Sequence, residues 1–99
     1  MPKIQQTRVF HDWEQSLRDR HGKGLIASHI FRIANGLTGD VKYLGHKVFE
    51  LRVHYGPGYR VYFMQQNAET IVLLNAGKKG SQRRDIAKAM RLAKTVEQA

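Results

Sequence analysis

The amino-acid sequence predicts an α+β fold in which helices cover an antiparallel sheet. Apolar residues recur at helical spacing in two segments near the start of the chain and in one at its end. Residues 41–75, between them, form a run of short strand patterns separated by turn residues. Helical and strand segments that are grouped in this way are typical of layered α+β domains. The length of 99 residues suits one domain, so we expect a single domain over residues 1–99.

The first third of the chain predicts a short strand and two helices. Residues 4–9 alternate weakly and form the expected strand. A helix is expected from about residue 12 to residue 20, with Trp13 packed between it and the sheet, and the glycines in residues 21–24 indicate its end. A second helix is expected from about residue 25 to residue 35, because apolar residues recur there at helical spacing; they are Ile26, Ile30, Ile33 and Leu37.

The rest of the chain predicts four strands and a last helix. The strands are expected over residues 41–44, 47–55, 59–65 and 70–75, and a Gly-Pro-Gly turn joins the second to the third. Residues 70–75 are almost continuously apolar or β-branched, which indicates a central strand covered on both faces. A basic loop over residues 77–80 then leads to a helix that ends near Thr95. The apolar stripe of this helix consists of Ile86, Ala89, Met90 and Ala93.

The residues that can carry chemistry lie on the hairpin of residues 47–65. Side chains alternate along a strand, so Glu50, Arg52 and His54 share one face. Across the turn, Arg60 and Tyr62 share that face, because a slip of one residue would bury the arginines. Two guanidinium groups can grip a phosphate, and a histidine exchanges a proton near neutral pH. We therefore expect an outward-facing cradle for a phosphodiester, although Glu50 can also form an ordinary cross-strand ion pair and His54 can be a plain surface residue.

Positive charge is concentrated in the second part of the chain. The net charge is +9, of which residues 1–40 contribute +2 and residues 41–99 contribute +7. Such a field attracts polyanions, although membrane headgroups or an acidic protein partner would also suit it. Lys78 lies in a glycine-containing loop before a helix N-terminus, which favours an anion, while a solvated basic loop is the alternative. The residues that we expect to bind RNA are Lys42, Lys47, Lys79, Arg83, Arg84 and Lys88.

The composition argues against several other classes of protein. The chain has no cysteine, so neither a disulfide framework nor a thiolate metal site is expected. Its five histidines have no close ligand spacing with carboxylates or with each other, so we expect no metal and no cofactor. The chain shows no hydrophobic signal region and no apolar run long enough to span a membrane. A cytoplasmic protein is the expectation.

Two segments of the hairpin form a specific motif, Glu50-Leu51-Arg52 and residues 55–63, Tyr-Gly-Pro-Gly-Tyr-Arg-Val-Tyr-Phe. Weaker signals are residues 40–45 and 73–79 with Gln82, Asp85 and Ile86. With these segments the chain resembles, from about residue 8 to residue 95, the RelE/ParE toxin superfamily, close to its HigB branch of addiction-module killer proteins. The resemblance implies two N-terminal helices, an antiparallel sheet and a C-terminal helix. It also implies a toxin of a type II toxin–antitoxin pair, whose partner is a small antitoxin that commonly carries a helix-turn-helix.

The resemblance further implies a ribosome-dependent mRNA endonuclease that needs no metal, with the ribosome and mRNA as partners. Such an enzyme uses the 2′-hydroxyl as nucleophile and needs proton transfer and cations at the phosphate. By this resemblance, Arg52, Arg60 and Lys78 would supply the cations. His54 or Tyr62 would move the protons.

The chain departs from this family pattern near its C-terminus. Several nuclease relatives place a catalytic tyrosine or histidine there, whereas residues 64–99 contain no aromatic residue and no histidine. The ParE branch of the superfamily inhibits DNA gyrase. A non-nuclease toxin that inhibits gyrase or another protein is therefore the alternative, and an RNA-binding module without activity is a third reading.

Overall fold

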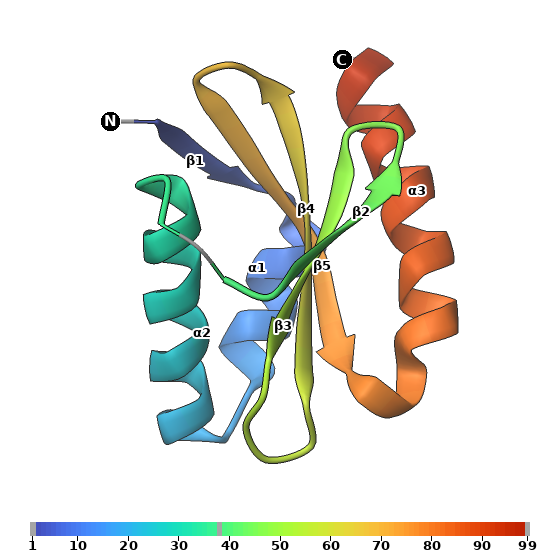
Figure 1. The fold of residues 1–99 in the computed structure, drawn as a ribbon. Helices are drawn as coiled ribbons and strands as arrows, with labels where there is room; N and C mark the ends of the chain where they lie inside the picture. The colour runs from blue at the N-terminus through green and yellow to red at the C-terminus, as the bar shows by residue number, and fades with distance from the viewer. Residues whose placement is uncertain (1, 38, 99) are drawn as a thin grey trace.

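A five-stranded mixed sheet with helices on both faces forms the centre of the protein (Figure 1). The computed structural model describes residues 2–37 and 39–98. In chain order the elements are β1 (Lys3–Gln6), α1 (Arg8–Ser16), α2 (Arg20–Ala34), β2 (Val41–Gly45), β3 (Val48–Val53), β4 (Tyr59–Asn67), β5 (Thr70–Lys78), a 3-10 turn (Lys79–Ser81) and α3 (Gln82–Gln98). The strand order is β1-β5-β4-β3-β2. The α+β prediction is confirmed.

The expectation of a purely antiparallel sheet is wrong for its first strand. Strand β1 pairs with β5 in parallel, whereas the β2–β3, β3–β4 and β4–β5 pairs are antiparallel. The reason lies in the chain path. After β1 the chain passes through two helices, enters the sheet again at the opposite edge, and returns strand by strand until β5 lies beside β1.

Each face of the sheet carries its own hydrophobic core. Helices α1 and α2 cover one face and α3 covers the other (Figure 1). The first core contains Phe10 and Ile30 from the helices, with Leu51 and Phe63 from the sheet. Strand β5 contributes to both cores, so the prediction of a central strand covered on both faces is confirmed. The second core contains Val48, Tyr62, Met64, Val72 and Leu74 from the sheet, with Ala89 and Ala93 from α3.

The N-terminal helices start earlier than their sequence predicted. Helix α1 begins at Arg8 because the hydroxyl of Thr7 accepts a hydrogen bond from the Phe10 amide at 3.1 Å. Helix α2 begins at Arg20 because the Asp19 carboxylate accepts from the Gly22 amide at 2.9 Å. Residues 21–24 are therefore part of α2, and their prediction as a helix end is wrong. The capped first turn outweighs the helix-breaking tendency of the glycines.

The β2–β3 and β3–β4 hairpins differ in how well their sequences suit their geometry. The β3–β4 register is the one predicted, with Glu50 opposite Tyr62 and Arg52 opposite Arg60. The β2–β3 turn instead places two non-glycine residues, His46 and Lys47, at φ 52° and 67°. A two-residue turn with both φ values positive favours Asn-Gly, and other residues there cost about 1–2 kcal/mol each.

Strand and helix ends near the C-terminus also differ from the prediction. Strand β5 continues to Lys78 and α3 continues to Gln98, so the expected loop shortens to the 3-10 turn. No helix of the described residues is both long and apolar enough to cross a membrane.

Candidate functional site

A buried carboxylate organises the polar side chains on the α3-facing side of the sheet. Glu50 is completely buried. Its Oε1 accepts a hydrogen bond from Arg52 Nε at 3.0 Å, and its Oε2 accepts from Gln82 Nε2 at 2.7 Å and from the Tyr62 hydroxyl at 3.3 Å. Strand β3, strand β4 and the start of α3 are thereby joined through one side chain.

The protonation states of this network follow from its contacts. Burial raises the pKa of Glu50, but the hydrogen bonds from Gln82 and Arg52 and the nearby positive charges lower it more, so the net pKa lies below its usual range. Burial and the adjacent carboxylate raise the pKa of Tyr62 above its usual range. Tyr62 is therefore a neutral hydrogen-bond donor, and Glu50 is ionised near neutral pH.

A histidine and a second carboxylate continue the network toward solvent. His54 Nε2 lies 2.5 Å from Asp40 Oδ2, and Arg52 Nη1 lies 3.7 Å from Asp40 Oδ1. The hydrogen bond from His54, more than any other contact, lowers the pKa of Asp40. An ionised carboxylate accepts hydrogen bonds only, so it selects the tautomer with hydrogen on Nε2. Nδ1 of a neutral His54 is then a proton acceptor, on a side chain that is 69% exposed.

Arg60 lies at the centre of the site without a direct partner. Arg60 is 7% exposed and pairs with Arg52 in the β3–β4 register. Its buried Nε has no hydrogen-bond partner among the described residues. Its charge contributes to the lowered pKa of both Asp40 and Glu50, so it lies within electrostatic reach of both carboxylates. An unpaired buried guanidinium is costly and indicates a place where an anion would be favoured.

The start of α3 closes this side of the site. Asp85 is buried and lies within hydrogen-bond distance, 2.5 Å, of the Ser81 hydroxyl. A Cβ atom at Gly77, which stands opposite Arg60, would come within 2.0 Å of Asp85 Oδ2, so only glycine allows this approach. Asn75 donates to the Asp85 carbonyl at 3.0 Å, while its own Oδ1 is buried without a partner.

The structure brings most of the predicted site residues onto one face. Arg52, Arg60 and Tyr62 share that face, and His54 lies directly after the end of β3, as expected from the alternation of side chains along the strands. The expectation of an outward-facing surface is wrong for Arg60 and Tyr62, and for Glu50 beside them, because α3 packs over this face. Tyr62 is therefore not available for stacking on a base in this conformation.

The predicted lysine of the site lies elsewhere. The register places Lys78 opposite Tyr59, a residue of the first core, and thus on the other face from Arg60. Lys78 is exposed there. The six residues expected to bind RNA are also exposed. Lys47 makes an ion pair with Glu97 at 3.0 Å, and the others form no ion pair with a described residue.

Several residues of the network escaped the sequence analysis. Asp40 lay within residues 40–45 of the resemblance but was not predicted as a site residue, and its proximity to His54, fourteen positions later, comes from the pairing of β2 with β3. Gln82 and Asn75 lay within the weaker segments of the resemblance but were given no role, because they join the network only when α3 packs on the sheet. Throughout residues 2–37 and 39–98, no three His, Cys, Asp or Glu side chains form a group that could hold a metal ion.

Comparison with known proteins gives the family. Residues 24–96 match the family described as phage-derived protein Gp49-like (DUF891), a span that includes every residue of the network. The chain is also similar to an uncharacterized protein of Haemophilus influenzae (strain ATCC 51907 / DSM 11121 / KW20 / Rd), with 38% identity over 94 residues that cover 95% of each chain. The chain therefore belongs to the phage-derived Gp49-like family, a toxin-like family of toxin–antitoxin systems.

Proposed function

We propose that this protein is the toxin of a type II toxin–antitoxin module and cleaves mRNA on the ribosome, as in the RelE/ParE superfamily and its HigB branch. The observation that carries the proposal is the buried guanidinium of Arg60, which has no hydrogen-bond partner among the described residues. A cation held in this way favours an anionic ligand. Arg52 on the neighbouring strand and His54 at the end of the same face supply the other groups that phosphodiester cleavage needs.

The geometry supports a reaction in which the 2′-oxygen attacks the adjacent phosphorus. His54 Nδ1 accepts the proton of the 2′-hydroxyl while Asp40 holds the opposite ring nitrogen. The new 2′-O–P bond forms as the 5′-O–P bond breaks, and the 5′-oxygen takes a proton from solvent. The products are a 2′,3′-cyclic phosphate and a 5′-hydroxyl. Arg52, whose side chain is partly exposed, stabilises the negative charge of the pentacoordinate phosphate, and the buried Arg60 adds its positive charge from the neighbouring strand.

The remaining cations suit the partners. Lys79, Arg83, Arg84 and Lys88 are exposed at and beyond the 3-10 turn, and Lys42 is exposed on β2. Together with the net charge of +9, they favour docking on ribosomal RNA and mRNA in a salt-dependent way. The cognate antitoxin is the expected protein partner.

A non-nuclease toxin that inhibits gyrase or another protein is the second candidate. It is favoured by the ion pairs of Arg52, whose charge is already balanced by Glu50 and Asp40. It is also favoured by the burial of Tyr62, which removes one candidate for proton transfer.

The deciding experiment maps mRNA ends after induced expression of the protein and its variants. Arg60→Met should abolish growth arrest and discrete mRNA breaks, and its thermal unfolding shows whether the variant still folds cooperatively. His54→Ala should abolish the breaks, and His11→Ala, on α1 away from the site, serves as its control. Breaks that persist in Arg60→Met would refute the proposed site. A DNA-damage response without mRNA breaks in the wild type would favour the gyrase inhibitor.

A further inference from the structure

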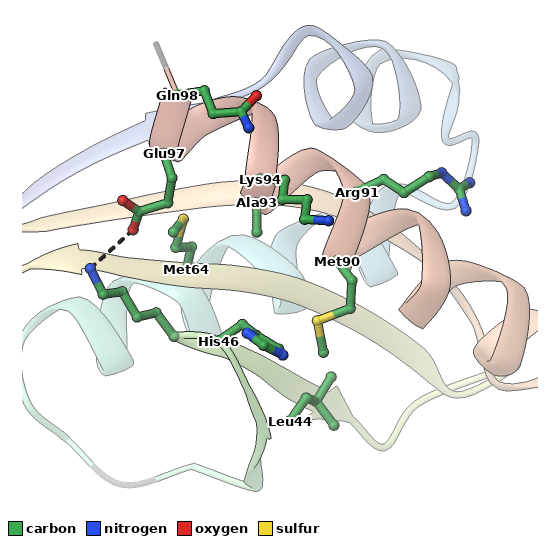
Figure 2. A pocket seen from close by; sticks show the side chains of 10 residues that line it. Leu44, His46, Met64, Met90, Arg91, Ala93, Lys94, Glu97 and Gln98 are labelled. Atoms are coloured by element: carbon green, nitrogen blue, oxygen red, sulfur yellow. Dashed lines mark hydrogen bonds and ion pairs between the residues drawn. The ribbon is translucent and has the colours of Figure 1, made fainter.

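A groove with an apolar floor lies between the β2–β3 turn and the C-terminal half of α3 (Figure 2). Its volume is about 770 Å³. The apolar residues that line it are Leu44 and Met64 from the sheet and Met90 and Ala93 from α3. Met64 and Ala93 are buried in the second core, so the half-buried Leu44 and Met90 provide the apolar surface that a ligand can reach. None of the described residues that line the groove belongs to the polar network around Glu50, so the two sites are separate.

The rim of this groove is positively charged. Arg91 and Lys94 on α3 are exposed and form no ion pair with a described residue. Lys47 lies on the opposite side, where its Nζ contacts Glu97 at 3.0 Å (dashed in Figure 2). Both partners of this pair are about half exposed, so solvent screens it and an incoming carboxylate can replace Glu97.

The turn beside the groove keeps two side chains where the backbone disfavours them. His46 and Lys47 have positive φ values, although Asn-Gly would relieve the strain of such a turn. Both residues line the groove. Backbone strain of this kind clusters at functional sites, and here the retained side chains are the ones that border the groove.

We propose that this groove binds an acidic, amphipathic helix of a protein partner. The positive rim selects carboxylates, and the half-buried Met90 beside Leu44 gives an apolar floor that adapts to different side chains. Leu44 and Met64 belong to the core on the α3-facing side of the sheet, with Leu44 on the edge strand β2. A helix satisfies its own backbone hydrogen bonds and can place one row of apolar side chains against α3 and this side of the sheet. The described lining contains no Phe, Tyr or Trp on which bases stack, which disfavours RNA as the occupant. The proposal is independent of the nuclease activity.

The test uses a synthetic 16-residue peptide with leucines on one helical face and glutamates elsewhere. One control peptide has the same composition with the leucines dispersed, and another has lysine in place of glutamate. Binding is followed by fluorescence anisotropy and by the methyl NMR signal of Met90 in the full-length protein. We expect the acidic amphipathic peptide to shift the Met90 signal and to bind at least tenfold more tightly than either control.

Variants of the protein locate the binding site. Met90→Glu and Lys94→Glu should each lower the affinity for the acidic amphipathic peptide at least tenfold. Lys3→Glu, the same charge change as Lys94→Glu but on the far edge strand β1, should leave the affinity unchanged. The double change His46→Asn with Lys47→Gly relieves the strained turn, so it should fold at least as well and still bind at least fivefold more weakly.

Any one of three results would overturn the proposal. The peptide does not bind at millimolar concentration, a control peptide binds equally well, or Lys94→Glu binds the peptide with unchanged affinity. A single-stranded RNA probe that shifts Met90 and displaces the peptide would identify a nucleic acid as the occupant. A Met90 signal that shifts with protein concentration alone would identify a second copy of the chain.

Discussion

Replacing Glu50 by glutamine tests whether one buried carboxylate holds the sheet and α3 together. The change keeps the size of the side chain but removes its charge and places an NH₂ group at one of its two acceptor positions. Arg52, Gln82 and Tyr62 now all donate to this carboxylate. In the variant, at least one of these donors would face another donor.

The expected loss of stability follows from these contacts. A hydrogen bond to a charged group contributes about 1.5–3 kcal/mol, and a buried donor left without a partner costs a further 1–3 kcal/mol, roughly. Because Arg52 is partly exposed and keeps Asp40 nearby, we expect Glu50→Gln to lower the free energy of unfolding by about 2–4 kcal/mol. For a domain of this size, that corresponds to a fall in Tm of roughly 10–25 °C.

Stability is measured by urea unfolding, monitored through the fluorescence of Trp13, and Glu97→Gln is the matched control. Glu97 makes one exposed ion pair, so its replacement should cost less than about 1 kcal/mol. Equal losses in the two variants would refute the argument that Glu50 organises the site.

The difference in the free energy of unfolding between the wild type and Glu50→Gln should also depend on pH, which gives a second check. The folded-state pKa of Glu50 lies below its ordinary value of 4.5, so its contribution is complete above that pH and is lost as the pH falls through the lowered pKa. The gap between the wild type and Glu50→Gln should therefore stay constant from about pH 7 to pH 5 and narrow in more acidic solution. A gap that widens on acidification would contradict the assignment of an ionised Glu50.

Four further substitutions each test a single residue. Gly24→Ala should stabilise the protein by about 0.5–1 kcal/mol, because nothing lies within 4 Å of the new Cβ and alanine favours the helix. Gly77→Ala should lower the free energy of unfolding by about 2 kcal/mol or more, because its Cβ would meet Asp85. Urea unfolding measures both changes. The backbone hydrogen bond at the start of α2, above all, lowers the pKa of Asp19, so the stability difference between the wild type and Asp19→Asn should close as the pH falls below 3.8; a difference that persists in strong acid would contradict this cap. Lys79→Glu should weaken RNA binding and flatten its dependence on salt in filter-binding titrations, and an unaltered slope would show that this lysine contacts no phosphate.

The sequence predicted those features that depend on near neighbours in the chain. The hairpin register followed from the alternation along β3 and β4, since a slip of one residue would have placed Val61 among polar groups and Arg60 in the first core. The apolar stripe of α3 and the two covered faces of β5 were also visible as periodicity. Helix starts were less accurate, because the capping side chains of Thr7 and Asp19 are single residues whose effect outweighed a longer glycine pattern.

By itself, then, the amino-acid order determined which side chains of the hairpin share a face, because a strand alternates with a period of two residues. Only the tertiary structure decided that this face would be covered. Helix α3 packs across it from the far end of the chain, buries Glu50 and Arg60, and brings Gln82 to the carboxylate. The meeting of Asp40 with His54 likewise required β2 to join the sheet. Contacts between distant segments arise from the packing of whole helices and strands, which no local periodicity encodes.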